Sequence, residues 1–205
     1  MKRLKTLWAA ARRRPFRALY ALGVCLLALT LVGNFVLDQL LYAAGVLKET
    51  TVTLQNAEQY TLVNMENTGD GLVSTTGDAQ LLLNPGTLVR RLRLVAWYEG
   101  EASAEKDLYY HLPGFGYTAH LRVWPTAQPD GSWLYTLPRS AGQGLRLDLA
   151  DTAGVAVELD AIVLNERPAW QQYFIPSAWQ LFWLAALPGL AGCAVTLKRE
   201  KGEDE

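Results

Sequence analysis

Two long apolar runs bracket this chain, and each of them borders a group of basic residues. The first run, 18–37, follows four arginines at positions 12 to 17, and the second, 175–197, precedes three basic residues at positions 198 to 201. A hydrocarbon core about 30 Å thick requires about 20 apolar residues in a helix, and each run supplies them. Because basic flanks stay on the cytoplasmic side, we expect two spans of the plasma or inner membrane with both termini cytoplasmic.

This pattern predicts five segments along the chain. They are a basic cytoplasmic leader at 1–17, a transmembrane helix at 18–46, an extracytoplasmic β-domain at 48–168, a second transmembrane helix at 174–197 and a cytoplasmic tail at 198–205. A cleaved signal peptide is the alternative for the first run, with Ala43-Ala44-Gly45 as a fair cleavage site. The run is longer than the 7 to 15 residues typical of signal peptides, which favours an uncleaved anchor.

Charge is divided sharply between these segments. The leader has seven basic residues and no acidic one, whereas 48–168 has nine basic and fifteen acidic residues, a net charge of −6. An acidic domain disfavours nucleic acid as its partner, because phosphates would repel it, so we expect no nucleic-acid partner. The leader suits the anionic headgroups of a lipid bilayer. Cys25 and Cys193 both lie in the apolar runs, so the domain has no disulfide available.

Between the runs, the hydrophobic period changes to that of strands. Turn sequences such as Asn84-Pro85-Gly86 separate short apolar-polar alternations, which is typical of an antiparallel sandwich or barrel. The expected strands are 51–54, 59–63, 71–74, 79–83, 88–98, 107–111, 118–124, 132–137, 144–149 and 155–164. The fold class expected is therefore mostly β, an antiparallel β-sandwich flanked by an N-terminal and a C-terminal transmembrane helix.

Alternation also predicts which side chains face the core. The inward sets are Leu92, Leu94 and Ala96; Ala119, Leu121 and Val123; Leu145, Leu147 and Leu149; and Val155, Val157 and Leu159. The apolar phase of the last strand changes at Ile162, which predicts a bulge near Asp160-Ala161.

Small residues recur every four positions in both runs. Ala21 and Cys25 lie in the first run, and Ala185, Gly189 and Cys193 lie in the second. Such stripes let helix backbones approach closely, so we expect the two spans to pair along them. Chance spacing in Ala- and Gly-rich helices is the alternative. Aromatic residues at 170–183 should lie at the outer membrane interface.

No set of residues indicates catalysis. His111 and His120 are the two histidines, no Gly-x-Ser-x-Gly motif or phosphate-binding loop is present, and two histidines do not make a zinc site. Two acidic groups, 99–107 and 148–160, could hold calcium or serve glycoside hydrolysis, although a solvated rim is the simpler interpretation. We expect a protein that is not an enzyme and has no cofactor, with calcium as the one alternative.

The candidate ligand-binding residues are aromatic and basic. Trp97 shares one predicted face with Arg93, Trp124 shares another with Arg122 and His120, and Tyr98 lies nearby in sequence. Aromatic rings beside polar groups can stack a sugar and bind its hydroxyls, which is the general composition of a binding site. The same residue types favour a protein or lipid interface, or packing within the sandwich.

The last third of the domain resembles a known family. Segments 132–137, 144–149 and 155–164 are similar to the closing strands of galactose-binding-like jelly-roll domains, with the motif Leu145-Arg146-Leu147-Asp148. The family often continues this motif with Pro-Gly, whereas this chain has Leu149-Ala150. Such domains occur beside membrane spans in bacterial cell-surface glycosyltransferases and polysaccharide-assembly proteins, whose catalytic domain this chain does not show.

The resemblance implies a jelly-roll fold and a cell-envelope setting. We expect a non-catalytic module that binds or positions a glycan or a lipid-linked sugar, beside a larger membrane glycosyltransferase. The alternative function is a structural accessory subunit that docks a larger membrane protein and has no sugar site.

Overall fold

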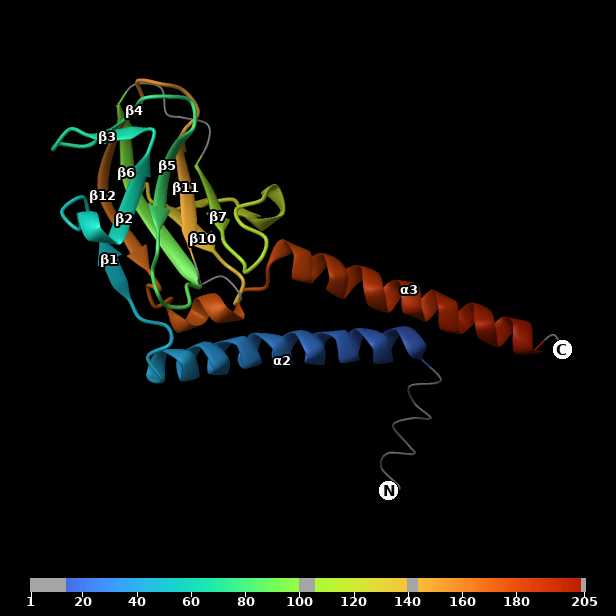
Figure 1. Cartoon of the computed structure of the whole chain (residues 1–205). Coiled ribbons are helices and arrows are strands. Elements are labelled where there is room, and N and C mark those ends of the chain that lie inside the picture. The colour runs from blue at the N-terminus through green and yellow to red at the C-terminus, as the bar shows by residue number, and fades with distance from the viewer. Residues whose placement is uncertain (1–13, 100–105, 140–143, 204–205) are drawn as a thin grey trace. The chain divides into compact units, whose positions relative to one another are not determined.

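The computed structural model describes residues 14–99, 106–139 and 144–203, with side chains described as far as Leu197. The chain divides into two compact units (Figure 1). One contains Met1–Leu40 with Pro168–Glu205, and the other contains Leu41–Arg167. Each unit is described by itself below.

The first unit contains two long apolar helices, α2 (Pro15–Ala43) and α3 (Ala178–Glu203), with a 3-10 helix η3 (Trp170–Phe174) before the second. By length and composition, the segments Pro15–Ala43 and Trp170–Leu197 are both able to cross a membrane. Helix α3 begins with a capping box, in which the Gln180 amide donates to the Ser177 hydroxyl and the Ser177 amide donates to the Gln180 side chain.

The second unit is a β-sandwich of two antiparallel sheets. Sheet A has the order β3 (Met65–Asn67), β4 (Leu72–Ser74), β12 (Ala156–Leu164), β6 (Arg91–Glu99), β10 (Trp133–Thr136) and β9 (Thr126–Ala127), with β1 (Thr50–Val52) also paired to β12. Sheet B has the order β2 (Tyr60–Val63), β5 (Ala79–Leu83), β11 (Leu145–Ala150), β7 (Asp107–Tyr110) and β8 (Arg122–Val123). Two short 3-10 helices, η1 (Ala57–Gln59) and η2 (Ala119–Leu121), lie in the connections.

The core lies between the inner faces of these sheets, and strand register explains its composition. In sheet B, Leu62, Leu81, Leu147 and Leu108 pair in one row across β2, β5, β11 and β7. In sheet A, Leu94 pairs with both Ile162 and Trp133. Successive strands thus place apolar residues of the same phase side by side, which buries a continuous layer.

Most predicted core faces are confirmed. The inward residues expected in β6 and β11 are all buried, as are Val157 and Leu159 in β12. The predicted bulge is also confirmed, because the register between β12 and β6 shifts between Leu159 and Ala161. The segment 118–124 differs from the expected strand. Its first half is the 3-10 helix η2, in which Ala119 is exposed, and only Arg122 and Val123 pair with a neighbour.

One buried asparagine joins several segments at an end of the sandwich. Asn165 is fully buried and follows β12 with a φ of 54°. Its side-chain oxygen accepts from the Arg90 amide at 2.8 Å, and its Nδ2 donates to the carbonyls of Leu88 at 2.8 Å and Lys48 at 3.3 Å. The Tyr42 hydroxyl, from the last turn of α2, donates to the Asn165 carbonyl at 3.1 Å. One side chain thereby fixes the starts of β1 and β6 against the end of β12.

Candidate functional site

The outer face of sheet B carries an organised row of charged and aromatic side chains. Arg146 on β11 pairs in register with Tyr109 on β7, and Tyr109 pairs with Arg122 on β8. The residues that flank each of them in sequence point into the core, so these three side chains point outward. The Arg146 guanidinium lies 5.2 Å from the centre of the Tyr109 ring, and that of Arg122 lies 6.0 Å from it. We call these three residues the Arg-Tyr-Arg row.

Trp124 extends this row at the edge of the sheet. The Arg122 guanidinium carbon lies 3.8 Å from the centre of the Trp124 ring system, a distance typical of cation–π stacking. The tryptophan is nevertheless 66% exposed. Its ring is therefore held from one side while much of its apolar surface is available to a ligand.

Two buried carboxylates underlie the arginines of this row. Asp107 is 1% exposed and forms an ion pair with Arg122, and Asp148 accepts from Arg146 at 2.6 Å and 2.7 Å. Asp107 and Asp148 also pair with each other in register across β7 and β11. Burial raises the pKa of Asp107, and the nearby Asp148 carboxylate adds to that effect, while Arg122 opposes it. The hydrogen bonds with Asp148 raise the pKa of Arg146, so this guanidinium stays charged.

Some polar atoms of the face remain available to a ligand. Arg146 donates hydrogen bonds to Asp148 from Nε and Nη2, and to Asp78 from Nη2. Within the described residues its Nη1 has no hydrogen-bond partner. The Tyr109 hydroxyl is also without a partner among those residues, and the Asp78 side chain is 63% exposed. The face therefore offers both hydrogen-bond donors and acceptors beside an aromatic ring.

Sheet A carries the other predicted tryptophan on its own outer face. Trp97 on β6 is 51% exposed, and its ring packs against Gly131 in the β9–β10 turn, where an added Cβ would lie 3.2 Å from ring atoms. Arg93, four residues earlier on the same face, donates to Asp130, Ser132 and Glu166. Hydrogen bonds from Ser132 lower the pKa of Asp130. Trp97 and Arg93 thus share a face, although about 13 Å of strand separates them.

The structure therefore divides the predicted ligand-binding residues among three places. Trp124 and Arg122 lie together on sheet B, with His120 exposed in η2 just before them. Trp97 and Arg93 lie on sheet A. Tyr98 points inward, packs against the core and donates its hydroxyl to the Leu149 carbonyl at 3.1 Å, and burial raises its pKa.

Tyr109 and Arg146 were not among the predicted ligand-binding residues, and Asp107 and Asp148 were considered only as members of the acidic groups at 99–107 and 148–160. Alternation placed Arg146 and Asp148 on the outer face, which was the available signal. Their position beside Trp124 depends on the pairing order β11-β7-β8, and no local pattern in the sequence encodes that order.

The two helices contact each other near Ala185 and Gly189 of α3. The Tyr20 hydroxyl donates to the Ala185 carbonyl at 2.9 Å, and an added Cβ on Gly189 would lie 3.4 Å from that hydroxyl. Gly192 is buried against the Phe16 ring. Of the predicted pairing residues, Ala185 (through its carbonyl) and Gly189 lie beside Tyr20, although Ala185 is exposed, as are Ala21, Cys25 and Cys193.

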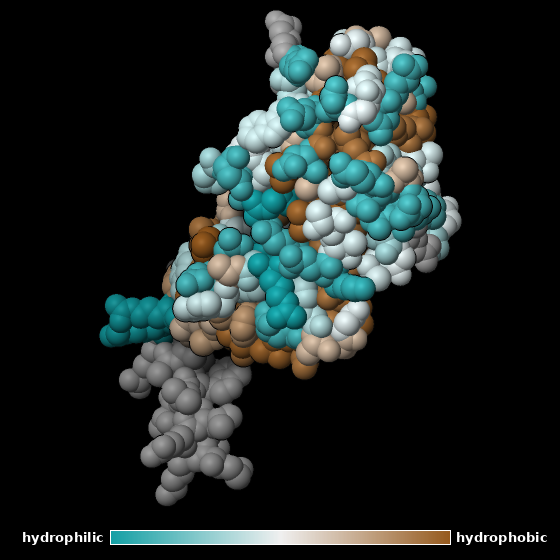
Figure 2. All heavy atoms as spheres, turned by 90° about the vertical axis from the view of Figure 1, so that its left-hand side faces the viewer, coloured by the Kyte–Doolittle hydropathy of each residue, from teal (hydrophilic) through white to brown (hydrophobic). Residues whose placement is uncertain are grey.

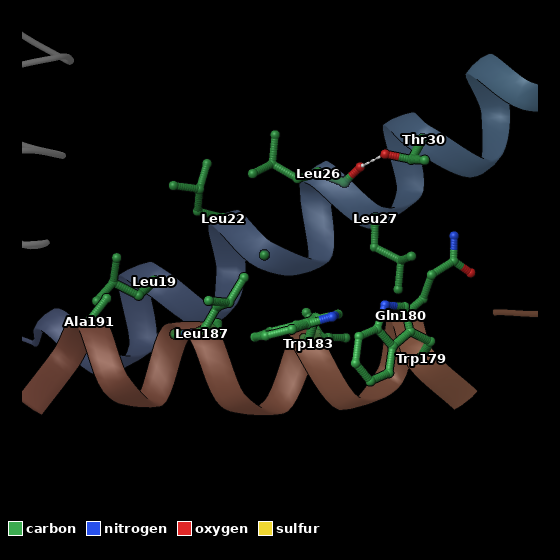
Figure 3. A pocket seen from close by; sticks show the side chains of 13 residues that line it. Leu19, Leu22, Leu26, Leu27, Thr30, Trp179, Gln180, Trp183, Leu187 and Ala191 are labelled. Atoms are coloured by element: carbon green, nitrogen blue, oxygen red, sulfur yellow. Dashed lines mark hydrogen bonds between the residues drawn. The ribbon is translucent and has the colours of Figure 1, made fainter. Parts of the chain in front are cut away.

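An apolar groove of about 400 Å³ runs between the helices (Figure 3). Leucines of α2, among them Leu22 and Leu26, line one wall, and Trp179, Trp183 and Leu187 of α3 line the other. Thr30 lies at one end and bonds back to the Leu26 carbonyl at 2.8 Å. This lining suits lipid chains or the side chains of another apolar helix.

The described residues include no group of three or more His, Cys, Asp or Glu side chains placed to hold a metal ion. His111 contacts the Tyr117 ring edge-on at 5.7 Å. Of the acidic residues considered for calcium or hydrolysis, Glu101 and Glu105 lie outside the described residues, and Asp107 is engaged with Arg122.

Figure 2 shows one side of the molecule. Hydrophilic residues cover much of the part of the sandwich seen there, with smaller hydrophobic areas between them. Such a surface is typical of a domain that faces water, because single exposed apolar residues are normal on soluble surfaces.

Comparisons with known proteins give distant structural similarities. No family model matches the chain, and no curated protein sequence matches it. Similar solved structures include a low-affinity xylan-binding module, CBM86, from Roseburia intestinalis (13% identity, TM-score 0.37, covering 57% of this chain and 94% of that one). Another is CBM35 from Paenibacillus barcinonensis (14% identity, TM-score 0.32, 58% and 99%).

A third similar structure is an acetyl xylan esterase, Est2A, from Butyrivibrio proteoclasticus, with 12% identity and a TM-score of 0.33. It is matched over 60% of this chain but only 34% of its own length, about a third of the esterase. Since all three TM-scores lie below 0.4, we transfer no ligand from these proteins to this chain.

Proposed function

We propose that this protein is a membrane-anchored, non-catalytic β-sandwich that binds a neutral glycan on the outer face of sheet B. The observation that supports this proposal is Trp124, which is 66% exposed although its ring is stacked on Arg122. A large exposed ring held in place loses little freedom when it binds, which favours affinity. The polar atoms of Arg146, Tyr109 and Asp78 would then bind sugar hydroxyls beside the stacked ring.

The charges on this face favour a neutral ligand. Arg122 is paired with Asp107, and Arg146 is paired with Asp148 and Asp78, so neither cation lacks a counterion. An anionic ligand would have to compete with these carboxylates, whereas sugar hydroxyls can donate to and accept from groups that are already paired. We therefore expect uncharged hexose or pentose units.

In this proposal the helices α2 and α3 are transmembrane anchors. The basic residues that precede α2 and those at the end of α3 support a topology with both termini in the cytoplasm, in which the sandwich would be extracytoplasmic. The glycan would be part of a surface polysaccharide or its lipid-linked precursor, handled by a larger membrane glycosyltransferase. A jelly-roll connectivity of the sandwich belongs to the same proposal.

Replacing the exposed tryptophan tests the proposal. We expect the full chain, in detergent micelles, to bind members of an array of neutral oligosaccharides, and Trp124→Ala to weaken that binding by about 30-fold, the effect of losing a hot-spot residue worth about 2 kcal/mol. Trp97→Ala is the matched control, because it removes an exposed tryptophan from the other sheet and should leave affinity within about twofold.

Three outcomes would contradict the proposal. These are no binding by the wild-type chain, equal binding by Trp124→Ala, or a loss of binding that follows Trp97→Ala instead.

The mostly exposed apolar helices favour a second candidate function, a structural subunit that docks another membrane protein through α2 and α3. That candidate predicts a wild-type chain that binds no member of the array.

A further inference from the structure

Asp107 is a buried charged group whose role the proposed function leaves unexplained. Its side chain is 1% exposed, yet it lies on the outer side of β7, between the sheet and the side chains above it. One oxygen, Oδ2, forms an ion pair with the Arg122 guanidinium, while within the described residues neither Oδ1 nor Oδ2 has a hydrogen-bond partner of ordinary geometry. A buried carboxylate with an unsatisfied oxygen destabilises a fold, so its presence calls for an explanation.

The contacts form three layers. Asp107 lies against the sheet, the Arg122 guanidinium lies on Asp107, and the Trp124 ring lies on the guanidinium at 3.8 Å. A guanidinium is planar, and its orientation is fixed when a carboxylate binds one edge. The plane of Arg122 in turn sets the plane of the ring that stacks on it.

Resting on the proposed function, we propose that Asp107 is a positioning residue, which holds Arg122 and through it orients Trp124 toward the glycan. The ligand would touch Trp124 and not the buried carboxylate. Binding would then depend on the ionised form of Asp107, because a protonated carboxyl no longer attracts the guanidinium. The glycan face is thereby sensitive to acid.

The groups around Asp107 determine the direction of this effect. Arg122 on β8 favours its ionised form, whereas burial and the Asp148 carboxylate on β11 favour its protonated form. Tyr109 on the same strand, Tyr135 on β10 and the Asp148-paired Arg146 are the other titratable neighbours, and the tyrosine pKa values lie above their ordinary range. Since the pKa of Asp107 is raised above 3.8, affinity should fall as the pH is lowered through that raised value.

The test follows Trp124 directly, without a ligand. Subtracting the fluorescence of Trp124→Phe from that of the full chain isolates the signal of this one ring. We expect the difference signal to titrate with a midpoint above 3.8, and to become independent of pH in Asp107→Asn. In parallel, Asp107→Asn should weaken binding to the oligosaccharide array by about tenfold at pH 7 and abolish its pH dependence between pH 4 and 7.

Arg122→Lys provides a second variant that retains the charge on Asp107's partner. Lysine lacks the planar guanidinium that lies under Trp124. The Trp124 difference signal of Arg122→Lys at pH 7 should therefore match the signal that the wild type gives in acid. A wild-type signal that does not change with pH, or a titration that persists in Asp107→Asn, would overturn the inference. A titrating signal in a chain that binds no oligosaccharide would instead contradict the proposed function and leave the positioning role standing.

Discussion

Asn165→Ala is expected to lower the free energy of unfolding by about 4 kcal/mol, because each buried hydrogen-bonding group left without a partner costs about 1 to 3 kcal/mol. The substitution leaves the Arg90 amide and the carbonyls of Leu88 and Lys48 without their side-chain partner at a fully buried position. It also places alanine at a φ of 54°, a left-handed conformation that asparagine tolerates better than alanine does, by about 1 kcal/mol.

Asn64 provides a matched control for this variant. It has a similar φ of 56°, but its side chain is exposed and makes one hydrogen bond, to the Asp78 carbonyl at 2.9 Å. Asn64→Ala should therefore cost about 1 kcal/mol, mainly because alanine tolerates this left-handed conformation less well than asparagine. Urea unfolding of the full chain in micelles, monitored by circular dichroism, compares the two variants. Equal losses of unfolding free energy would show that the buried hydrogen bonds of Asn165 contribute little.

Leu81→Ala should lower the free energy of unfolding by about 3 kcal/mol, as truncation of a fully buried leucine typically does. Leu81 is 0% exposed and lies in register between Leu62 and Leu147, so little can move to fill the cavity that it leaves. Leu82, the next residue of β5, faces outward between Thr61 and Arg146 and is half-buried.

Leu82→Ala is thus the control for the assignment of inner and outer faces in sheet B. We expect Leu82→Ala to cost less than half as much as Leu81→Ala, measured as the shift in urea midpoint at unchanged slope. The reverse order of the two losses would mean that the inner and outer faces of sheet B are assigned incorrectly.

Local patterns predicted the strands well where alternation was strong. Segments 79–83 and 155–164 agree with β5 and β12 within one residue, and the phase change in the latter correctly predicted a bulge. The strands β3 and β9 were not predicted, since three- and two-residue strands have too few alternating positions to stand out. Segment 118–124 has the alternation of a strand, yet half of it forms η2, because alternation does not encode which neighbour is available for pairing.

Only part of the candidate site could be predicted from local sequence patterns. Alternation separated Trp97 and Arg93 from the core correctly, but it gave no reason to place Trp124 on the opposite sheet from Trp97. Tyr98 shows the same limit, because its hydroxyl bonds to the Leu149 carbonyl of the other sheet across the core. The buried Asp107 under Arg122 depends on the pairing of β7 with β8, which joins residues separated by a loop.

We propose that two membrane-spanning helices display the sandwich on the side of the membrane opposite both termini. It can be tested by labelling single cysteines with a membrane-impermeant maleimide in spheroplasts, after Cys25 and Cys193 are replaced by alanine. Thr136→Cys, at an exposed position of β10, should react in intact spheroplasts, and Glu205→Cys should react only after lysis. Protection of Thr136→Cys until lysis, or labelling of Glu205→Cys before it, would contradict this arrangement.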